Sequence, residues 1–392
     1  ALQPPAPPST PAAGGRGGGG RGGGPRVAYS ARWEGTLTPP TTGLFRFAVS
    51  GAGNAELTIG THLVATMRPG SPNPAQGTVA LDAGKPVPIK LDYTTRGGNN
   101  AAVRLGWQAP DAAMTAEAEK AAKDSDVAIV FVGERLGEGT DKQSLNLPGD
   151  QDDLIERVAR INPRTIVVLN TPTAEAMPWI DRVAAVIYAG YPGQFSGDII
   201  SAVLFGDANP SGKLTITFPS DERQGPGSTP ASYPGLDGQT VARDEDILIG
   251  YRYFDAKNQA PLFPFGYGLS YTTFSYGPLQ LAATATGRAA TIQITNSGAR
   301  DGAEVVQLYL GYPAAANEAP RVLKGFDRVE LKAKESKVVT IPLDDEALPV
   351  WDEAAKSWKT FPGVYTVSIG SSSRDIRAKA TFTAQPRTAQ PR

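Results

Sequence analysis

The sequence predicts a multidomain fold in which an antiparallel β-sandwich, an α/β sandwich with a mainly parallel sheet, and a second, small β-sandwich follow one another. Three observations predict it. The 392 residues exceed the length of one ordinary domain. Apolar residues alternate with polar ones toward both ends of the chain, as in strands with one buried face. Between these regions, helical patterns alternate with short apolar runs, which is typical of a parallel sheet with covering helices.

The two termini are predicted to lie outside the folded domains. Residues 1–26 are rich in Pro, Ala and Gly, and such a segment cannot bury enough apolar surface to offset the entropy of ordering it. We therefore expect a disordered linker. An RNA-binding Arg/Gly tract is the alternative, but three arginines without interleaved aromatic residues favour the linker. Residues 386–392 are expected to form a tail.

The first sandwich is predicted over residues 27–110. Short stretches with period-two alternation are separated there by glycines, which are typical of turns. The clearest expected strands are residues 44–49, 55–59 and 87–93. His62, the only histidine, lies in an expected hairpin, where a partly exposed turn position is its simplest interpretation.

The α/β domain is predicted over residues 111–219. Residues 127–132 form a continuous apolar run, as expected for a strand buried on both faces. The remaining expected elements are helices at residues 112–123, 151–160 and 196–204 and strands at residues 165–169, 183–188 and 213–218.

An irregular connector and a second β domain complete the predicted organisation. Residues 220–277 hold many Pro and Gly residues and several aromatic ones, so we expect an ordered segment without regular structure. Residues 278–385 again show strand patterns. The strands are expected at residues 290–295, 303–310, 336–341 and 364–369.

The composition limits which groups can perform chemistry. A formal net charge of −1 gives no overall attraction to nucleic acid or anionic membranes, and no apolar run is long enough to span a bilayer. Without cysteine, disulfides and thiolate catalysis are excluded. A Ser-His-Asp triad or a multi-histidine metal site is excluded unless His62 serves alone. Carboxylates, Lys, Arg, Tyr, Ser or Thr must therefore carry any reaction, and we expect no metal and no cofactor.

The candidate site is the loop from Glu134 to Lys142, directly after the apolar run 127–132. In an open parallel sheet, ligands bind outside the carboxyl ends of the strands. This loop contains three carboxylates and two cations, together with glycines that allow sharp turns. Its position and composition are those expected for a catalytic acid.

Six short motifs follow one another in order along residues 112–385. They are Gly137–Lys142 with Leu145–Gln151, Asn162–Thr171, Met177–Trp179, Tyr191–Gln194, Leu204–Leu214 and Pro261–Phe274. In this order they resemble the signatures of the C-terminal portion of a family three glycoside hydrolase of the β-glucosidase type. At the first motif, that family shows Glu-Gly-x-Asp-Arg followed by Leu-x-Leu-Pro-Gly-x-Gln.

The resemblance implies the type of the two flanking domains. Residues 29–47 resemble the protective-antigen-type β-sandwich that some members insert into the α/β domain, where it walls the substrate pocket. Related adhesins bind calcium and sugar through an Asp pair. Gly53 and Asn54 stand in its place here, so calcium-dependent binding is not expected. In the family, the last motif leads into an immunoglobulin-like (fibronectin type III-like) domain, which is the fold expected for residues 278–385.

The resemblance also implies retaining, exo-acting hydrolysis of terminal β-linked sugars. Such enzymes need two carboxyl groups about 5–5.5 Å apart. Glu138 matches the acid/base of the family, and Glu134 is the rival. Asp141 and Lys142 match the Asp-Arg pair that follows the acid. Lys142 departs from this pattern, and because Lys lacks the planar two-pronged contact of Arg, weaker ordering of the loop is expected.

The nucleophile of the family has no counterpart in this sequence. The family supplies it as an Asp on an N-terminal barrel, and neither that barrel nor the first half of the α/β domain is found here. The expected partners are a β-linked oligosaccharide or glycoside and the missing barrel, with no nucleic acid and no membrane. The chain alone is expected to be inactive. The resemblance further implies an extracellular or periplasmic location.

Two other interpretations compete with this one. The first is a non-catalytic carbohydrate-binding or scaffold protein, built from two β-sandwiches beside an inactive α/β domain. The second is a nucleotide- or flavin-binding α/β protein, which the absence of G-x-G-x-x-G and P-loop motifs at the strand-to-helix turns disfavours.

Overall fold

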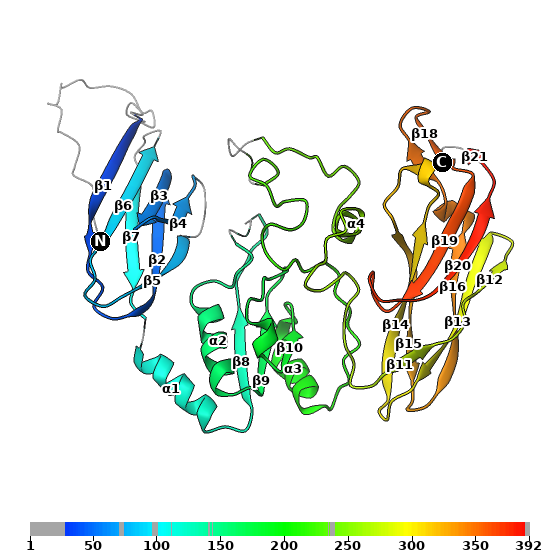
Figure 1. Cartoon of the computed structure of the whole chain (residues 1–392), viewed down its shortest axis with the longest axis horizontal. Coiled ribbons are helices and arrows are strands. Elements are labelled where there is room, and N and C mark those ends of the chain that lie inside the picture. Colours follow the sequence, from blue (N-terminus) through cyan, green and yellow to red (C-terminus); the bar gives the residue numbers. More distant parts are fainter. Residues whose placement is uncertain are drawn as a thin grey trace, which may run out of the picture. The chain divides into compact units, whose positions relative to one another are not determined.

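The chain divides into two compact units. The computed structural model describes residues 28–69, 74–95, 101–110, 112–139, 142, 144–233, 235 and 240–388. The first unit comprises Ala1–Asn170 and Met177–Tyr188, and the second comprises Thr171–Ala176 and Ala189–Arg392. The predicted linker at residues 1–26 and the candidate residue Asp141 lie outside the described residues. In Figure 1 the chain is coloured from blue at the N-terminus to red at the C-terminus.

The first unit begins with seven described strands in two antiparallel sheets. They are β1 (Tyr29–Leu37), β2 (Gly43–Ala52), β3 (Asn54–Ile59), β4 (His62–Met67), β5 (Ala75–Leu81), β6 (Val87–Thr95) and β7 (Ala102–Gln108). One sheet has the order β1-β6-β3-β4 and the other β5-β2-β7. Alternation on β2 buries Phe45, Phe47 and Val49 in one core with Leu57 and Leu91 from the facing sheet. His62 is exposed, as predicted.

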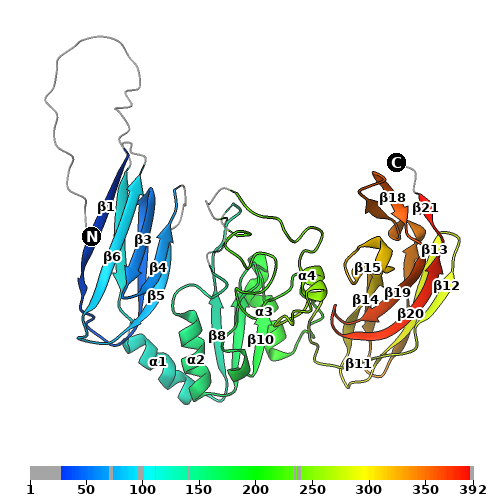
Figure 2. The same cartoon turned by 45° about the horizontal axis from the view of Figure 1, so that its top comes forward.

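The rest of the first unit is a small α/β layer. Its elements are α1 (Ala112–Lys123), β8 (Ala128–Gly133), α2 (Gln151–Ile161), β9 (Thr165–Asn170), a short 3-10 turn (Ile180–Arg182) and β10 (Ala185–Tyr188). The three strands pair in parallel in the order β10-β9-β8, which confirms the predicted parallel sheet. Helix α2 buries Ile155, Val158 and Ala159 on the side that contacts β8 and β9. Figure 2 shows the α/β layer from a second direction.

Strand β8 differs from its prediction, because it is not buried on both faces. Ala128, Val130 and Val132 are buried, whereas Ile129 and Phe131 remain 42% and 62% exposed. The physical reason is its position. Within the described residues β8 lies at the edge of the sheet, and α2 covers one of its faces.

The second unit begins with α3 and an irregular segment. Its short elements are a 3-10 turn (Gly193–Phe195), α3 (Ser196–Phe205) and α4 (Tyr251–Ala256). The predicted strand at residues 213–218 is wrong. Leu214 and Phe218 instead exchange backbone hydrogen bonds with Phe263, Gly266 and Tyr267 of the connector, so only an isolated bridge forms at Phe218.

Across the described part of the chain, no helix is long and apolar enough to cross a membrane.

The remainder of the second unit is all β, as predicted. Its strands are β11 (Phe274–Tyr276), β12 (Gln280–Ala283), β13 (Gly287–Asn296), β14 (Gly302–Gly311), β15 (Val322–Leu331), β16 (Ser336–Asp344), β17 (Val350–Asp352), β18 (Ser357–Thr360), β19 (Gly363–Gly370), β20 (Ile376–Ala384) and β21 (Arg387–Thr388), with 3-10 turns at Ala314–Ala316 and Asp345–Ala347. One sheet contains β11-β13-β12 with β16 on β13, another has the order β15-β14-β19-β20, and β17-β18-β21 form a small third sheet. Ile292, Leu308, Ile341 and Val367 lie in one core between the two larger sheets.

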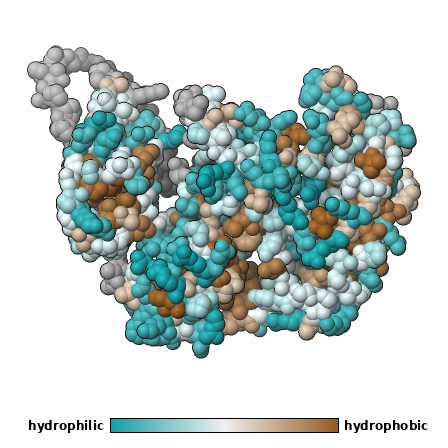
Figure 3. All heavy atoms as spheres, viewed as in Figure 1, coloured by the Kyte–Doolittle hydropathy of each residue, from teal (hydrophilic) through white to brown (hydrophobic). Residues whose placement is uncertain are grey.

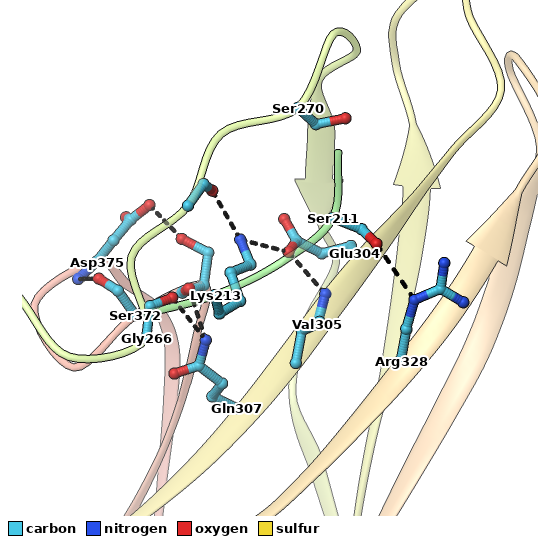
Figure 4. Close-up of polar contacts among 12 residues, drawn as sticks. Ser211, Lys213, Gly266, Ser270, Glu304, Val305, Gln307, Arg328, Ser372 and Asp375 are labelled. Carbon is cyan, nitrogen blue, oxygen red and sulfur yellow. Dashed lines mark hydrogen bonds and ion pairs between the residues drawn. The ribbon is translucent and has the colours of Figure 1, made fainter. Parts of the chain in front are cut away.

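A buried ion pair joins this β domain to the irregular segment of the same unit. The Lys213 ammonium lies 2.9 Å from a carboxylate oxygen of Glu304 on β14, and their side chains are 13% and 8% exposed. Lys213 also donates a hydrogen bond to the Gly268 carbonyl, and the Glu304 carboxylate accepts one from the Val305 amide (Figure 4). The residue predicted as part of a sheet strand therefore acts as an anchor for the β domain.

Candidate active site

The candidate catalytic loop leaves the parallel sheet at the carboxyl end of β8. Glu138 lies in its outer turn and is exposed, and Gly139 follows with φ of +76°, a left-handed conformation that glycine adopts without strain. This is the edge of a parallel sheet at which ligands bind. The loop therefore presents the Glu138 carboxylate to solvent at the carboxyl edge of the parallel sheet.

The two ends of this loop are joined by a buried ion pair. The Lys142 ammonium lies 3.1 Å from a carboxylate oxygen of Glu134, and the side chains are 13% and 7% exposed. The Glu134 amide also donates to the Asn170 carbonyl on β9. Glu134, the rival acid, is thus engaged at the base of the loop. Lys142 supplies a direct anchor, although it stands where the family shows Arg.

Gln151, the first residue of α2, ties that helix to the end of β8. Its side-chain amide donates to the carbonyls of Gly133 and Pro148, at 3.0 and 2.8 Å. Its side-chain oxygen accepts the Gly133 amide at 2.8 Å. These three bonds join the end of β8 to the start of α2, so both ends of the segment that contains the candidate loop are held together.

A second, partly buried carboxylate lies in the first turn of α2. Asp152 on α2 accepts a hydrogen bond from the Trp179 indole at 2.7 Å and one from the Leu147 amide at 3.2 Å. Burial raises the pKa of Asp152, and the bonds from Trp179 and Leu147 and the charge of Lys142 oppose that rise. Trp179 is fully buried.

The raised pKa of Asp152 predicts how stability depends on pH. The folded chain keeps this proton to a higher pH than the unfolded chain, whose Asp titrates near a pKa of about 3.9. The free energy of unfolding therefore falls as the pH rises from that value through the folded pKa, and stays lower above it. The melting temperature of the wild type minus that of Asp152→Asn should be largest near pH 4 and should decline toward pH 7. A constant difference in melting temperature across this range would contradict the prediction.

The ion pair between Glu134 and Lys142 predicts how firmly the loop is held. Lys142→Met removes the cation and leaves the buried Glu134 carboxylate without it, which typically costs about 3–5 kcal/mol locally. Amide hydrogen exchange should therefore become faster in residues 134–139. Lys142→Arg, which restores the family residue and keeps the charge, is the matched control and should preserve slow exchange. Equal exchange rates in Lys142→Met and wild type would show that the pair does not hold the loop.

The first β domain also contacts the end of this region. The Arg46 guanidinium on β2 lies 2.7 Å from Asp150, directly before α2. It approaches Gly149 so closely that an added Cβ there would lie 2.3 Å from an Arg46 nitrogen. A cavity of about 360 Å³ opens beside this contact, lined by Leu44, Arg46 and Met114 among others.

Sequence reasoning missed the roles of Gln151 and Asp152. Gln151 was noted as part of a motif, but nothing in the sequence showed that its amide bonds the end of β8. Asp152 carries no distinctive signal in the sequence, because acidic residues are common in the first turn of a helix. Among the described residues, no group of three or more His, Cys, Asp or Glu side chains could hold a metal ion.

Comparison with known proteins identifies the family. Residues 21–271 match the glycosyl hydrolase family 3 C-terminal domain, and residues 304–373 match the fibronectin type III-like domain. The chain therefore belongs to glycosyl hydrolase family 3, of which it carries the C-terminal portion.

Several β-glucosidases are similar to this chain. The β-glucosidase of Rhizobium radiobacter is 36% identical over 90% of this chain and 46% of its own length. The thermostable β-glucosidase B of Acetivibrio thermocellus is 40% identical over 70% of this chain and 37% of its own length. The crystal structure of DesR, a β-glucosidase from Streptomyces venezuelae in complex with D-glucose, matches with a TM-score of 0.70 and 40% identity, over 92% of this chain and 47% of that protein. The chain thus spans less than half the length of these relatives.

Proposed function

We propose that this chain is the acid/base-bearing portion of a retaining, exo-acting β-glucosidase, with Glu138 as the acid/base. The single observation that carries the proposal is the position of Glu138 at the carboxyl edge of the parallel sheet. It is exposed there, while Glu134 is engaged with Lys142 at the base of the same loop. Glu138 is therefore accessible to a bound glycoside, whereas the ion pair of Glu134 makes that residue a support of the loop.

Glu138 would act twice in each catalytic cycle. In the first step it protonates the oxygen of the leaving group while a second carboxylate attacks the sugar carbon and forms a glycosyl-enzyme. In the second step the Glu138 carboxylate removes a proton from water, which releases the sugar with its original configuration. The attacking Asp belongs to the barrel that the family resemblance implies. By itself the chain would therefore be inactive.

The substrate proposed is a terminal β-linked glucosyl unit, in line with the β-glucosidases among its relatives. A β-xyloside is the alternative, because the sugar contacts of the family lie mostly on the barrel. We also propose an extracellular or periplasmic location for the enzyme. In this enzyme the first β domain, which reaches Asp150 through Arg46, would wall the substrate pocket.

Hydrolysis of aryl β-glucoside and aryl β-xyloside tests the proposal. The chain is assayed alone and after mixing with a separately expressed family 3 barrel. Activity only in the mixture, lost in Glu138→Ala, is the expected result, and the better substrate identifies the sugar. Activity of the chain alone would contradict the missing-nucleophile argument. Oligosaccharide binding without activity in either assay would favour a carbohydrate-binding or scaffold protein.

A further inference from the structure

Two tryptophans of the β domain lie directly opposite each other on its small third sheet. Trp351 on β17 pairs with Trp358 on β18 in the antiparallel register, so both side chains project from the same face of the sheet. They are 44% and 51% exposed, and their ring centroids lie 5.8 Å apart. Figure 1 shows β18 and β21 at one end of this domain. We refer to Trp351 and Trp358 as the indole pair.

The indole pair keeps apolar surface that its own hairpin does not use. A cross-strand aromatic pair stabilises the hairpin that carries it, and the mutual contact of the rings buries part of each. About half of each side chain still faces water. Single exposed apolar side chains are normal on protein surfaces, and the face drawn in Figure 3 is mainly hydrophilic with apolar side chains in separate patches. Two adjacent indoles instead form one continuous apolar surface.

The turn that joins β17 to β18 is held by its own polar groups. The Asp352 carboxylate accepts hydrogen bonds from the amides of Ala354 and Ala355, both at 3.0 Å. Glu353 and Lys356 form an ion pair of 2.7 Å, and their side chains are 78% and 72% exposed. A hairpin ordered in this way presents the indoles without a further cost of ordering on binding. The exposed carboxylate and ammonium groups can accept hydrogen bonds from hydroxyl groups and donate to them.

We propose that the indole pair is a binding site for a soluble β-linked glucan chain, outside the acid/base loop. A glucosyl ring has an apolar face of C–H groups and a rim of hydroxyls, so it can stack on an indole and form hydrogen bonds at its edge. The two indole planes are inclined by 71°. They fit a chain that turns between successive sugars, and they do not match the flat surface of a crystalline polysaccharide.

Other occupants fit the indole pair less well. Two half-exposed indoles offer on the order of 200 Å², whereas each partner in a stable protein interface contributes about 800 Å². A second copy of the chain or another protein would therefore need contacts well beyond the pair. An anionic membrane surface attracts clusters of cations, but in this turn Asp352 and Glu353 stand beside a single cation, Lys356.

The choice of a β-glucan as the ligand rests on the proposed function. A site that holds the polymer raises the concentration of chain ends near the enzyme without any new contact to the reacting sugar. Binding at the indole pair requires neither Glu138 nor the barrel. It can therefore be measured on the chain alone, independently of hydrolysis.

Isothermal titration calorimetry on the full 392-residue chain tests the site. The probes are laminarihexaose and cellohexaose, with the α-linked maltohexaose as the negative control. The test variants are Trp351→Ala and Trp358→Ala, and Trp358→Tyr keeps an aromatic ring at the same position. Circular dichroism and the melting temperature verify that each variant folds. The matched control is Phe326→Ala, since Phe326 on β15 of the same unit is 67% exposed.

We expect laminarihexaose, whose linkage turns the chain, to bind more tightly than cellohexaose. The dissociation constant should rise by about 10-fold or more in each Ala variant, because half of an indole surface is lost, and should stay close to that of the wild type in Trp358→Tyr and Phe326→Ala. In the wild type, the indole N–H signals of Trp351 and Trp358 should shift in nuclear magnetic resonance spectra when laminarihexaose is added, which a purely structural pair would not show.

Three results would overturn the inference. They are a wild-type chain that binds neither β-linked probe, unchanged affinity in both Ala variants, and equal binding of maltohexaose. If the wild type and Trp358→Ala hydrolysed aryl glucosides equally in the presence of the barrel but neither bound laminarihexaose at the indole pair, this inference alone would fail. Binding at the indole pair without hydrolysis in the reconstituted enzyme would count against the proposed function alone.

Discussion

Replacement of Glu138 by Gln is expected to lower kcat/KM of the barrel-reconstituted enzyme by about 10²–10⁴-fold on glycosides with a poor leaving group. Gln has the size of Glu but cannot donate a proton to the departing oxygen. A dinitrophenyl glycoside needs no such proton, because its leaving group is stable as an anion. For this substrate kcat/KM should change little, whereas kcat should fall because water no longer has a base in the second step. Steady-state kinetics on a series of aryl glycosides measures both effects.

Glu134→Gln is the matched control for this experiment. It removes the charge that pairs with Lys142 but leaves Glu138 intact. A residue that only supports the loop should affect poor and good leaving groups to a similar extent. If instead Glu134→Gln produced the dependence on the leaving group and Glu138→Gln did not, the two carboxylates would have exchanged roles.

The regular elements were predicted well where the period of the apolar residues and the positions of turn residues agree. The helix expected at residues 112–123 is α1, and the strand expected at residues 165–169 lies within β9. In both places the apolar pattern has the period of a single element and polar or turn residues delimit it. The strand expected at residues 127–132 is β8, displaced by one residue to Ala128–Gly133.

The errors arise where tertiary partners decide the outcome. An apolar run such as residues 127–132 indicates that a strand belongs in the interior of a sheet, but it does not supply the neighbour that buries Phe131. Residues 213–218 have strand-like composition, yet their backbone finds partners at residues 263–267. Which partner a short apolar segment selects depends on chain topology, which local patterns do not encode.

In the candidate site, too, local patterns did not reveal the tertiary contacts. The motif placed Glu138, Asp141 and Lys142 in one loop and named the first as the acid/base, which stays a prediction. That Lys142 reaches back to Glu134 depends on how the loop folds over the end of the sheet. The weaker ordering of the loop expected from the exchange of Arg for Lys rests on side-chain shape and stays a prediction.

Replacement of Lys213 by Met is expected to destabilise the second unit by about 3–5 kcal/mol. The substitution preserves the apolar stem of the side chain but removes the charge 2.9 Å from Glu304, whose side chain is 8% exposed (Figure 4). Removing only the cation lowers the free energy of unfolding by more than the intact ion pair contributes, because water cannot solvate the buried carboxylate in its place. Urea unfolding, followed by circular dichroism, measures the loss as a lower transition midpoint.

Two further variants test whether the loss of stability comes from leaving a charge buried without its partner. Lys213→Met combined with Glu304→Gln removes both charges and retains an oxygen for the Val305 amide, so it should recover part of the stability that Lys213→Met loses. Arg328 and Glu330 form an ion pair of 2.7 Å whose side chains are 50% and 75% exposed. Arg328→Met should therefore cost no more than about 1 kcal/mol. If Arg328→Met proved as harmful as Lys213→Met, burial would not be the cause, and the anchoring role of the Lys213 pair would have to be abandoned.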